Sequence, residues 1–227
     1  MTDVGYLLSY VRYGDYDVIV HCFTQKMGFQ SYFLRGIYSA KNKKKAYLAP
    51  LNEITFVTDE YYKSNIVNIK KIEQCKSLYS NDIRISSMIF FVAEFLSQVL
   101  KTEVKQENIY HAIKEFCNAV EREDFYAHFI FLVKFLKVQG VAPLVNEAKY
   151  LEPETGSFEM MESHHLFNEE ISSLWKNYIL ESGISNVKMK NELKRQFLDS
   201  VMLYYHYHFP DFKTPKSLEV LKMIFAE

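Results

Sequence analysis

Short runs in which apolar and polar residues alternate occupy the first third of the chain. Runs 6–13 and 17–24 are rich in Val, Ile, Tyr and Leu, and Gly14 and Asp15 between them are typical of a tight turn. Gly28 ends the next turn, and further runs follow at 29–37, 51–58 and 66–74. Five short strands without helical periodicity between them predict a small closed or nearly closed barrel, which removes exposed sheet edges.

The period changes to that of a helix after Asn81 and Asp82, which are typical N-cap residues. Helices are predicted at 83–100, 108–121, about 125–139, about 169–181, 191–207 and 217–225, and Gly140 fits a C-terminal cap. Segment 146–167 is neither helical nor clearly stranded. The pattern predicts an α+β chain, with a β-domain at 1–80 and an α-helical domain at 81–227 that has an irregular insertion at about 146–167.

Charge is distributed unevenly along the chain, although the formal net charge is −1. Residues 1–80 hold 11 Lys and Arg against 7 Asp and Glu, whereas residues 81–227 hold 16 against 21. If the protein binds a polyanion, we therefore expect the binding surface to lie in the first part.

Other bulk features predict a soluble, cytoplasmic protein. The longest apolar run, 88–93, is too short to span a bilayer, and no secretion signal is seen at the N-terminus. The three cysteines, Cys22, Cys75 and Cys117, are too far apart for a CxxC pair and indicate reduced thiols.

A search for catalytic motifs indicates that the chain is not an enzyme. The seven glycines form no GxGxxG, GxxxxGK[ST] or GxSxG pattern, and there is no HExxH. His164 and His165 are expected to be loop residues, because a metal site needs several convergent ligands. Cys117 lies on the apolar face of its helix, which favours a buried thiol over a nucleophile. We expect no catalytic residue, no cofactor and no metal.

One group of residues remains as a candidate site. Positive side chains beside strands of a small barrel can neutralise phosphates, and Tyr38 and Tyr47 are near enough in sequence to stack on bases. The alternative is that the lysine run is a solvated loop. Tyr32, Phe33 and Leu34 are expected in the barrel core or as structural surface rather than as base-stacking platforms. The candidate nucleic-acid-binding residues are Lys26, Arg35, Lys41, Lys43, Lys44 and Lys45.

The order of motifs in the chain resembles the RecO family of bacterial recombination mediators. The first strand leads to a Tyr-Gly-Asp turn, a Phe-Thr-x-x-x-Gly stretch follows, and an Arg-Gly step precedes the basic loop and a Pro-Leu pair. A Phe/Leu-rich helix ending in Gly and a Lys-Ser-Leu segment extend the resemblance over most of the chain. The matching positions are 13–15, 23–28, 35–36, 41–45, 50–51, 131–140 and 216–221.

The resemblance implies an OB-fold joined to an α-helical domain, and Arg35 and Lys41 to Lys45 match the basic positions of the family's OB domain. It also implies binding to single- and double-stranded DNA, strand annealing, and recombinase loading onto strands coated by single-strand-binding protein (SSB). The implied partners are the ring-forming mediator RecR and the acidic C-terminal tail of SSB. Lys134 and Lys137 are weak candidates for the tail site.

The chain departs from many relatives in one respect. They carry a four-cysteine zinc module after the third helix, where this chain has no cysteine and Asn146 stands near one expected position. We therefore predict an OB barrel and α-helical domain without a zinc module.

Two other functions are considered. The first is an OB-fold adaptor that holds protein partners together without binding DNA itself. The second, a hydrolase using His164 or His165, is disfavoured because no base, nucleophile and orienting group can be assembled.

Overall fold

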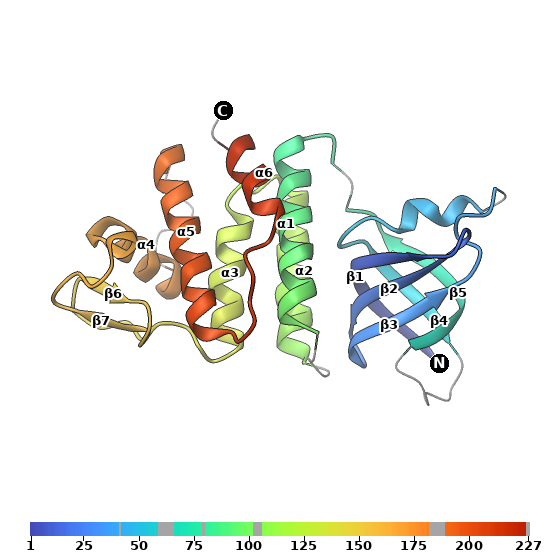
Figure 1. Ribbon diagram of the computed structural model, residues 1–227, viewed down its shortest axis with the longest axis horizontal. Coiled ribbons are helices and arrows are strands. Elements are labelled where there is room, and N and C mark those ends of the chain that lie inside the picture. Colours follow the sequence, from blue (N-terminus) through green and yellow to red (C-terminus); the bar gives the residue numbers. More distant parts are fainter. Residues whose placement is uncertain (41, 59–65, 79, 102–105, 182–188, 226–227) are drawn as a thin grey trace. The chain divides into compact units, whose positions relative to one another are not determined.

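A computed structural model describes residues 1–40, 42–58, 66–78, 80–101, 106–181 and 189–225 (Figure 1). The chain forms two compact units. The first contains residues 1–124 and 215–217, and the second contains 125–214 and the residues from Leu218 onward. The predicted division at residue 80 stays a prediction: the barrel strands end at Lys76, and the two helices after them group with the barrel.

The first unit begins with a closed five-stranded barrel. Its strands pair in the order β1-β2-β3-β5-β4, and β4 closes onto β1. All pairs are antiparallel except β3 with β5. This closed barrel is the OB-fold predicted from the sequence. The strands are β1 Thr2–Tyr13, β2 Asp17–Thr24, β3 Gly28–Leu34, β4 Glu53–Thr58 and β5 Ile66–Lys76.

Buried and less buried residues alternate along the strands, so that every second side chain points into the barrel. Most of these inward side chains are apolar. The Tyr32 and Phe56 rings stack there with centroids 4.6 Å apart. A register shift between Leu7 and Ser9 in β1 marks a bulge, which lets a long strand bend around a small barrel. Gly5 is needed where β1 meets β2, because a Cβ at this position would lie 2.8 Å from the Phe23 carbonyl oxygen. The core residues are Leu7, Val18, Val20, Cys22, Tyr32, Leu34, Ile37, Leu48, Ile54, Phe56, Val67 and Ile72.

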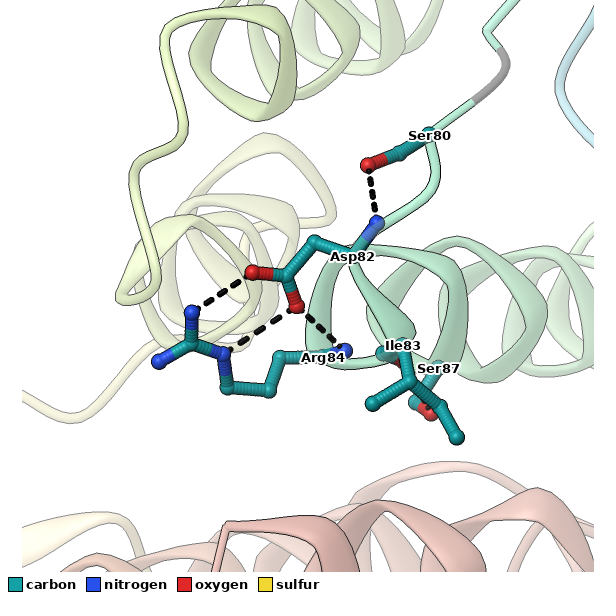
Figure 2. A network of polar contacts seen from close by, with 5 residues as sticks. All are labelled: Ser80, Asp82, Ile83, Arg84 and Ser87. Atoms are coloured by element: carbon teal, nitrogen blue, oxygen red, sulfur yellow. Dashed lines mark hydrogen bonds and ion pairs between the residues drawn. The ribbon is translucent and has the colours of Figure 1, made fainter.

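Two helices complete the first unit, α1 Ile83–Val99 and α2 Glu107–Glu121. Asp82 caps α1 as predicted: its Oδ1 accepts a hydrogen bond from the Arg84 backbone N–H at 2.8 Å. Figure 2 shows the same carboxylate held by the Arg84 guanidinium, with an Nη2–Oδ2 distance of 2.6 Å. The Arg84 side chain lowers the pKa of Asp82 to about 2.

Helix α2 packs against the barrel. The Tyr110 ring lies 5.1 Å from the Tyr6 ring, and its hydroxyl donates to Glu53 at 3.3 Å. At the end of α2, Glu121 pairs with Lys76 of β5 at 2.6 Å.

The second unit contains α3 Ala127–Val138, α4 Glu169–Leu180, α5 Asn191–His208 and most of α6 Ser217–Ile224. Trp175 is fully buried, and its indole N–H donates to the Ser200 hydroxyl at 3.0 Å. Tyr205 is also buried and donates its hydroxyl to the Leu132 carbonyl at 2.7 Å. These bonds satisfy the polar atoms of large aromatic side chains in the core.

The segment predicted to be irregular, 146–167, contains a small hairpin. Its strands are β6 Tyr150–Glu152 and β7 Ser157–Glu159, and the short 3₁₀ helix η2 His165–Phe167 follows. The hairpin was missed because three residues are too few for an alternating pattern to emerge. Predicted C-terminal helices are found within a few residues of their expected bounds.

Polar contacts hold this segment against α4. The Asn146 side-chain amide donates to the Phe158 carbonyl at 2.8 Å, and the Lys176 ammonium donates to the Asn146 carbonyl at 2.8 Å. The Ser172 hydroxyl accepts from the Leu151 backbone N–H at 2.9 Å. Within the described residues, no group of three or more His, Cys, Asp or Glu side chains is placed to hold a metal ion.

None of the described helices is long and apolar enough to cross a membrane.

Candidate nucleic-acid interface

The loop that leaves β3 is fixed to the barrel by short polar contacts. The Asp17 carboxylate at the start of β2 accepts from the Gly36 backbone N–H at 2.7 Å. The Tyr38 backbone N–H donates to the Tyr16 carbonyl at 3.0 Å. The loop therefore begins at a defined position at the end of the β1–β2 hairpin.

The lysine run forms a short 3₁₀ helix, η1 Lys43–Tyr47. Asn42 caps it, because its Oδ1 accepts from the Lys44 backbone N–H at 2.9 Å. Buried Asn52 holds the other end: its amide donates to the Ala46 and Tyr47 carbonyls at 3.4 and 3.3 Å. The Asn52 Oδ1 also accepts from the Leu78 backbone N–H at 3.0 Å, which ties η1 to the chain leaving β5.

Five positive side chains line an open groove of about 580 Å³ between this loop and β5. The Lys44 ammonium donates to the Ile72 carbonyl at 2.9 Å, which holds η1 against β5. Apolar and polar residues of β3, the loop and β5 complete the walls of the groove. The positive residues, which we call the basic groove, are Arg35, Lys43, Lys44, Lys70 and Lys71.

One carboxylate next to the groove is neutralised. Glu73 pairs with Lys71 at 2.6 Å. This hydrogen bond lowers the pKa of Glu73, with a further contribution from the charge of Lys44. Arg35, Lys43, Lys70 and Lys71 are exposed, so they can reach a phosphate in solution.

The structure brings together three of the six predicted residues. Arg35, Lys43 and Lys44 line the groove. Lys45 lies beside it in η1, with its ammonium 5.4 Å from the centre of the Tyr38 ring. Lys41 lies outside the described residues.

Lys26 lies at the other end of the barrel. It follows β2, and its ammonium donates to the Thr2 carbonyl at 2.7 Å. Arg35 follows the far end of β3, a strand of seven residues that spans roughly 20 Å at ~3.3 Å per residue. The structure therefore does not place Lys26 in the basic groove.

Lys70 and Lys71 were missed by the sequence analysis. Both lie in β5, which pairs in parallel with β3 and so comes next to the loop that follows β3. The two adjacent lysines were visible in the sequence, but they become part of the site only through the strand order.

The three residues expected in the barrel core or on its structural surface, and the two tyrosines of the loop, have different environments. Tyr32 and Leu34 are buried, as expected, and Phe33 is half-buried. Tyr38 and Tyr47 are half-buried against the barrel core, and the Arg12 guanidinium lies 4.5 Å from the Tyr38 ring centre.

The weaker candidates lie on α3 of the second unit. Lys137 pairs with Glu181 at 2.7 Å, and this bond lowers the pKa of Glu181 with a smaller contribution from Lys134. An acidic peptide bound at Lys137 would have to compete with Glu181.

The histidines and the buried cysteine have structural environments. His164 caps η2, since its Nδ1 accepts from the Leu166 backbone N–H at 3.1 Å, and its ring stacks on His165. Cys117 is buried as predicted, and burial raises its pKa to about 12.

The chain has a barrel with the strand order of an OB-fold, followed in sequence by helices. It is therefore an OB-fold protein with an α-helical region. The family described as "Recombination protein O N terminal" matches residues 1–78. Relatives called "DNA repair protein RecO" match nearly the whole chain. The protein from Flavobacterium psychrophilum is 30% identical over 97% of both chains. Those from Flavobacterium johnsoniae and Phocaeicola vulgatus are each 28% identical, over 97% and 98% of both chains.

The chain belongs to the RecO family of DNA repair proteins. The resemblance seen in the sequence motifs is thereby confirmed, and the family gives the chain a role in DNA repair and recombination.

Proposed function

We propose that the protein is a recombination mediator that binds single- and double-stranded DNA without sequence preference through the basic groove. The observation that carries this proposal is the convergence of five positive side chains from the β3 loop, η1 and β5 on one open groove. Phosphate contacts of this kind bind every sequence equally, because they do not reach the base edges.

The same contacts account for strand annealing without covalent chemistry. A strand held through its phosphates keeps its bases free to pair with a complement. The reaction then needs no nucleotide cofactor, because base pairing supplies the free energy. We propose that the protein acts in this way on strands coated by SSB and helps to load recombinase onto them.

The salt dependence of binding tests the role of the groove. Phosphate contacts from the four exposed groove residues, Arg35, Lys43, Lys70 and Lys71, predict an affinity for single strands that falls roughly 50-fold between 50 and 200 mM salt. Lys43→Gln or Lys70→Gln should weaken binding to all sequences alike and reduce the slope of log K against log salt by about 0.7. Fluorescence anisotropy with labelled oligonucleotides measures both quantities.

Lys114→Gln is the matched control, because it removes an exposed lysine from α2 in the same unit. A slope that is unchanged in the groove variants, or equally changed in the control, would contradict the assignment. Lys26→Gln in the same assay decides whether the predicted contact at the far end of the barrel takes part.

The proposed protein partners are a RecR-like ring and the acidic tail of SSB. For the tail, Lys134 and Lys137 remain candidates, with Glu181 as the internal competitor. Glu181→Gln should then strengthen binding of a tail peptide, whereas Lys137→Gln should weaken it. Calorimetric titration with the peptide measures both changes.

An adaptor function without DNA binding is the second candidate. The strongly exposed side chains of Leu144, Met160 and Met161, next to the β6–β7 hairpin in the sequence, favour it, because a partner that covered them would remove apolar surface from water. Purified protein that fails to bind oligonucleotides at low salt would support the adaptor and exclude the mediator function.

A further inference from the structure

An apolar row crosses the outward face of the sheet near the end of the β1–β2 hairpin. Strand pairing places Val11 opposite Ile19, and Ile19 opposite Phe33. Residues directly opposite each other share a face of the sheet. The flanking positions Val18, Val20, Tyr32 and Leu34 are buried in the barrel, so this row faces outward.

Tyr13 extends the row beyond the barrel core. Its ring meets the Phe33 ring at 84°, with centroids 5.4 Å apart. Tyr13 is nevertheless 59% exposed and Val11 57% exposed. We call these four residues, Val11, Tyr13, Ile19 and Phe33, the aromatic strip.

Arg35 joins the aromatic strip to the basic groove. Its guanidinium carbon lies 5.8 Å from the centre of the Phe33 ring, and the same residue lines the groove. The exposed Tyr13 ring and the half-buried Phe33 ring, beside positive side chains, match the two chemical parts of a single strand. Bases stack on rings while cations hold the phosphates.

We propose that the aromatic strip is a base-stacking site for single-stranded DNA, with Tyr13 and Phe33 as the stacking rings. For Phe33 this replaces the structural role expected from the sequence. The inference rests on the proposed DNA binding by the adjacent groove. A duplex has its bases stacked inside, so it can use the groove but not the strip. The two surfaces together would make the protein bind single strands more tightly than duplex of the same length.

The test uses three probes that share the phosphate backbone: oligo-dT, an abasic oligonucleotide of equal length and a duplex of that length. The wild-type protein is expected to bind oligo-dT about a hundredfold more tightly than the abasic strand, at about tenfold for each of two stacked bases. Tyr13→Ala should lose about tenfold on oligo-dT and nothing on the other two probes. Tyr13→Phe should keep the wild-type affinity, whereas Tyr13→Leu, which keeps apolar area without a ring, should behave like Tyr13→Ala.

Tyr207→Ala, which removes a 44%-exposed tyrosine from α5, is the control and should change nothing. Equal wild-type affinity for oligo-dT and the abasic strand, or an equal loss on all three probes in Tyr13→Ala, overturns the stacking site. In that case salt-sensitive binding to every probe leaves the groove proposal intact. Failure of the wild-type protein to bind any probe overturns both proposals.

Discussion

Gly156 is a residue whose missing side chain is required by its neighbour. A Cβ there would lie 2.6 Å from the Tyr204 hydroxyl oxygen, and the backbone has a φ of +67°. The same hydroxyl donates to the Val141 carbonyl at 2.8 Å, so it cannot move away without losing that bond. The absence of a side chain at Gly156 therefore lets the β6–β7 turn pack closely against Tyr204 of α5.

Gly156→Ala is expected to destabilise the second unit by about 2–4 kcal/mol, because it adds a steric clash to the strain of a positive φ. Gly140→Ala is the matched control: its φ is +72°, but no atom lies within 4 Å of the added Cβ. The control should cost only the backbone strain, about 1 kcal/mol. Urea denaturation measures both, and equal costs would contradict the close contact with Tyr204.

His128 lies in α3 at 1% exposure, between the Phe129 and Phe225 rings. Burial, with a smaller contribution from the charge of Lys194, lowers its pKa from 6.5 to about 3. The folded protein therefore keeps His128 neutral in a range where the unfolded chain binds a proton. Because the unfolded state binds more protons there, stability falls as the pH is lowered from 6.5 towards 3.

Each pH unit well inside that window should cost about 1.4 kcal/mol of stability. His128→Leu is expected to remove this part of the pH dependence, whereas the same change at the exposed His111 should leave it unchanged. Unfolding midpoints measured from pH 7 to 4 test this. Parallel pH profiles for wild type and His128→Leu would show that the histidine titrates normally.

The bounds of most strands and helices could be predicted from the sequence, because these elements are long enough for the hydrophobic pattern to repeat within them. The alternating run predicted at 17–24 has the same bounds as β2. Asp82, one of the two predicted N-cap residues, is the residue that caps α1. The β6–β7 hairpin was missed because its strands have three residues each. Sequence pattern identifies such elements only when several turns or pairs repeat.

The basic groove was only half visible for a different reason. Arg35, Lys43 and Lys44 are close in sequence, whereas Lys70 and Lys71 reach the groove through the parallel pairing of β3 and β5. Strand order is a long-range property that the hydrophobic pattern of each strand does not encode. Lys26 failed to join the groove because it lies at the opposite end of β2 and β3.

The position of η1 depends on Asn52, which is fully buried. Asn52→Ala would leave the Leu78 backbone N–H and the carbonyls of Ala46 and Tyr47 without these partners. We expect a loss of about 1–3 kcal/mol in stability. We also expect weaker DNA binding, because Lys43 and Lys44 lose their support.

Asn42→Ala is the comparison, because it removes the N-terminal cap of η1 and the hydrogen bond from the Asn42 amide to the Gly36 carbonyl but leaves the Asn52 contacts in place. It should cost about 1 kcal/mol. Thermal unfolding and oligonucleotide affinity measured on both variants test this. Unchanged DNA affinity in a folded Asn52→Ala protein would mean that η1 needs no fixed position.

The distribution of charge separates the proposed DNA-binding surface from the rest of the protein. With a formal net charge of −1, the protein as a whole offers no long-range attraction to DNA. The DNA binding that we propose must then come from local contacts in the basic groove and the aromatic strip. Such contacts favour salt-sensitive, reversible binding, which the proposed mediator needs when it passes strands to other proteins.

The two surfaces together predict how an annealed product leaves the protein. In the proposed mechanism, complementary strands are held through the basic groove and the aromatic strip. The duplex they form can keep only the groove contacts, so it should dissociate more readily. Tyr13→Ala brings the affinity for single strands closer to that for duplex, and added duplex should therefore inhibit annealing by the variant more strongly than by the wild type. The inhibition is measured as the fall in the rate of annealing of labelled strands when duplex is added. The assay uses limiting protein, contains EDTA and omits nucleotide. Equal inhibition of both proteins would mean that base stacking has no part in product release.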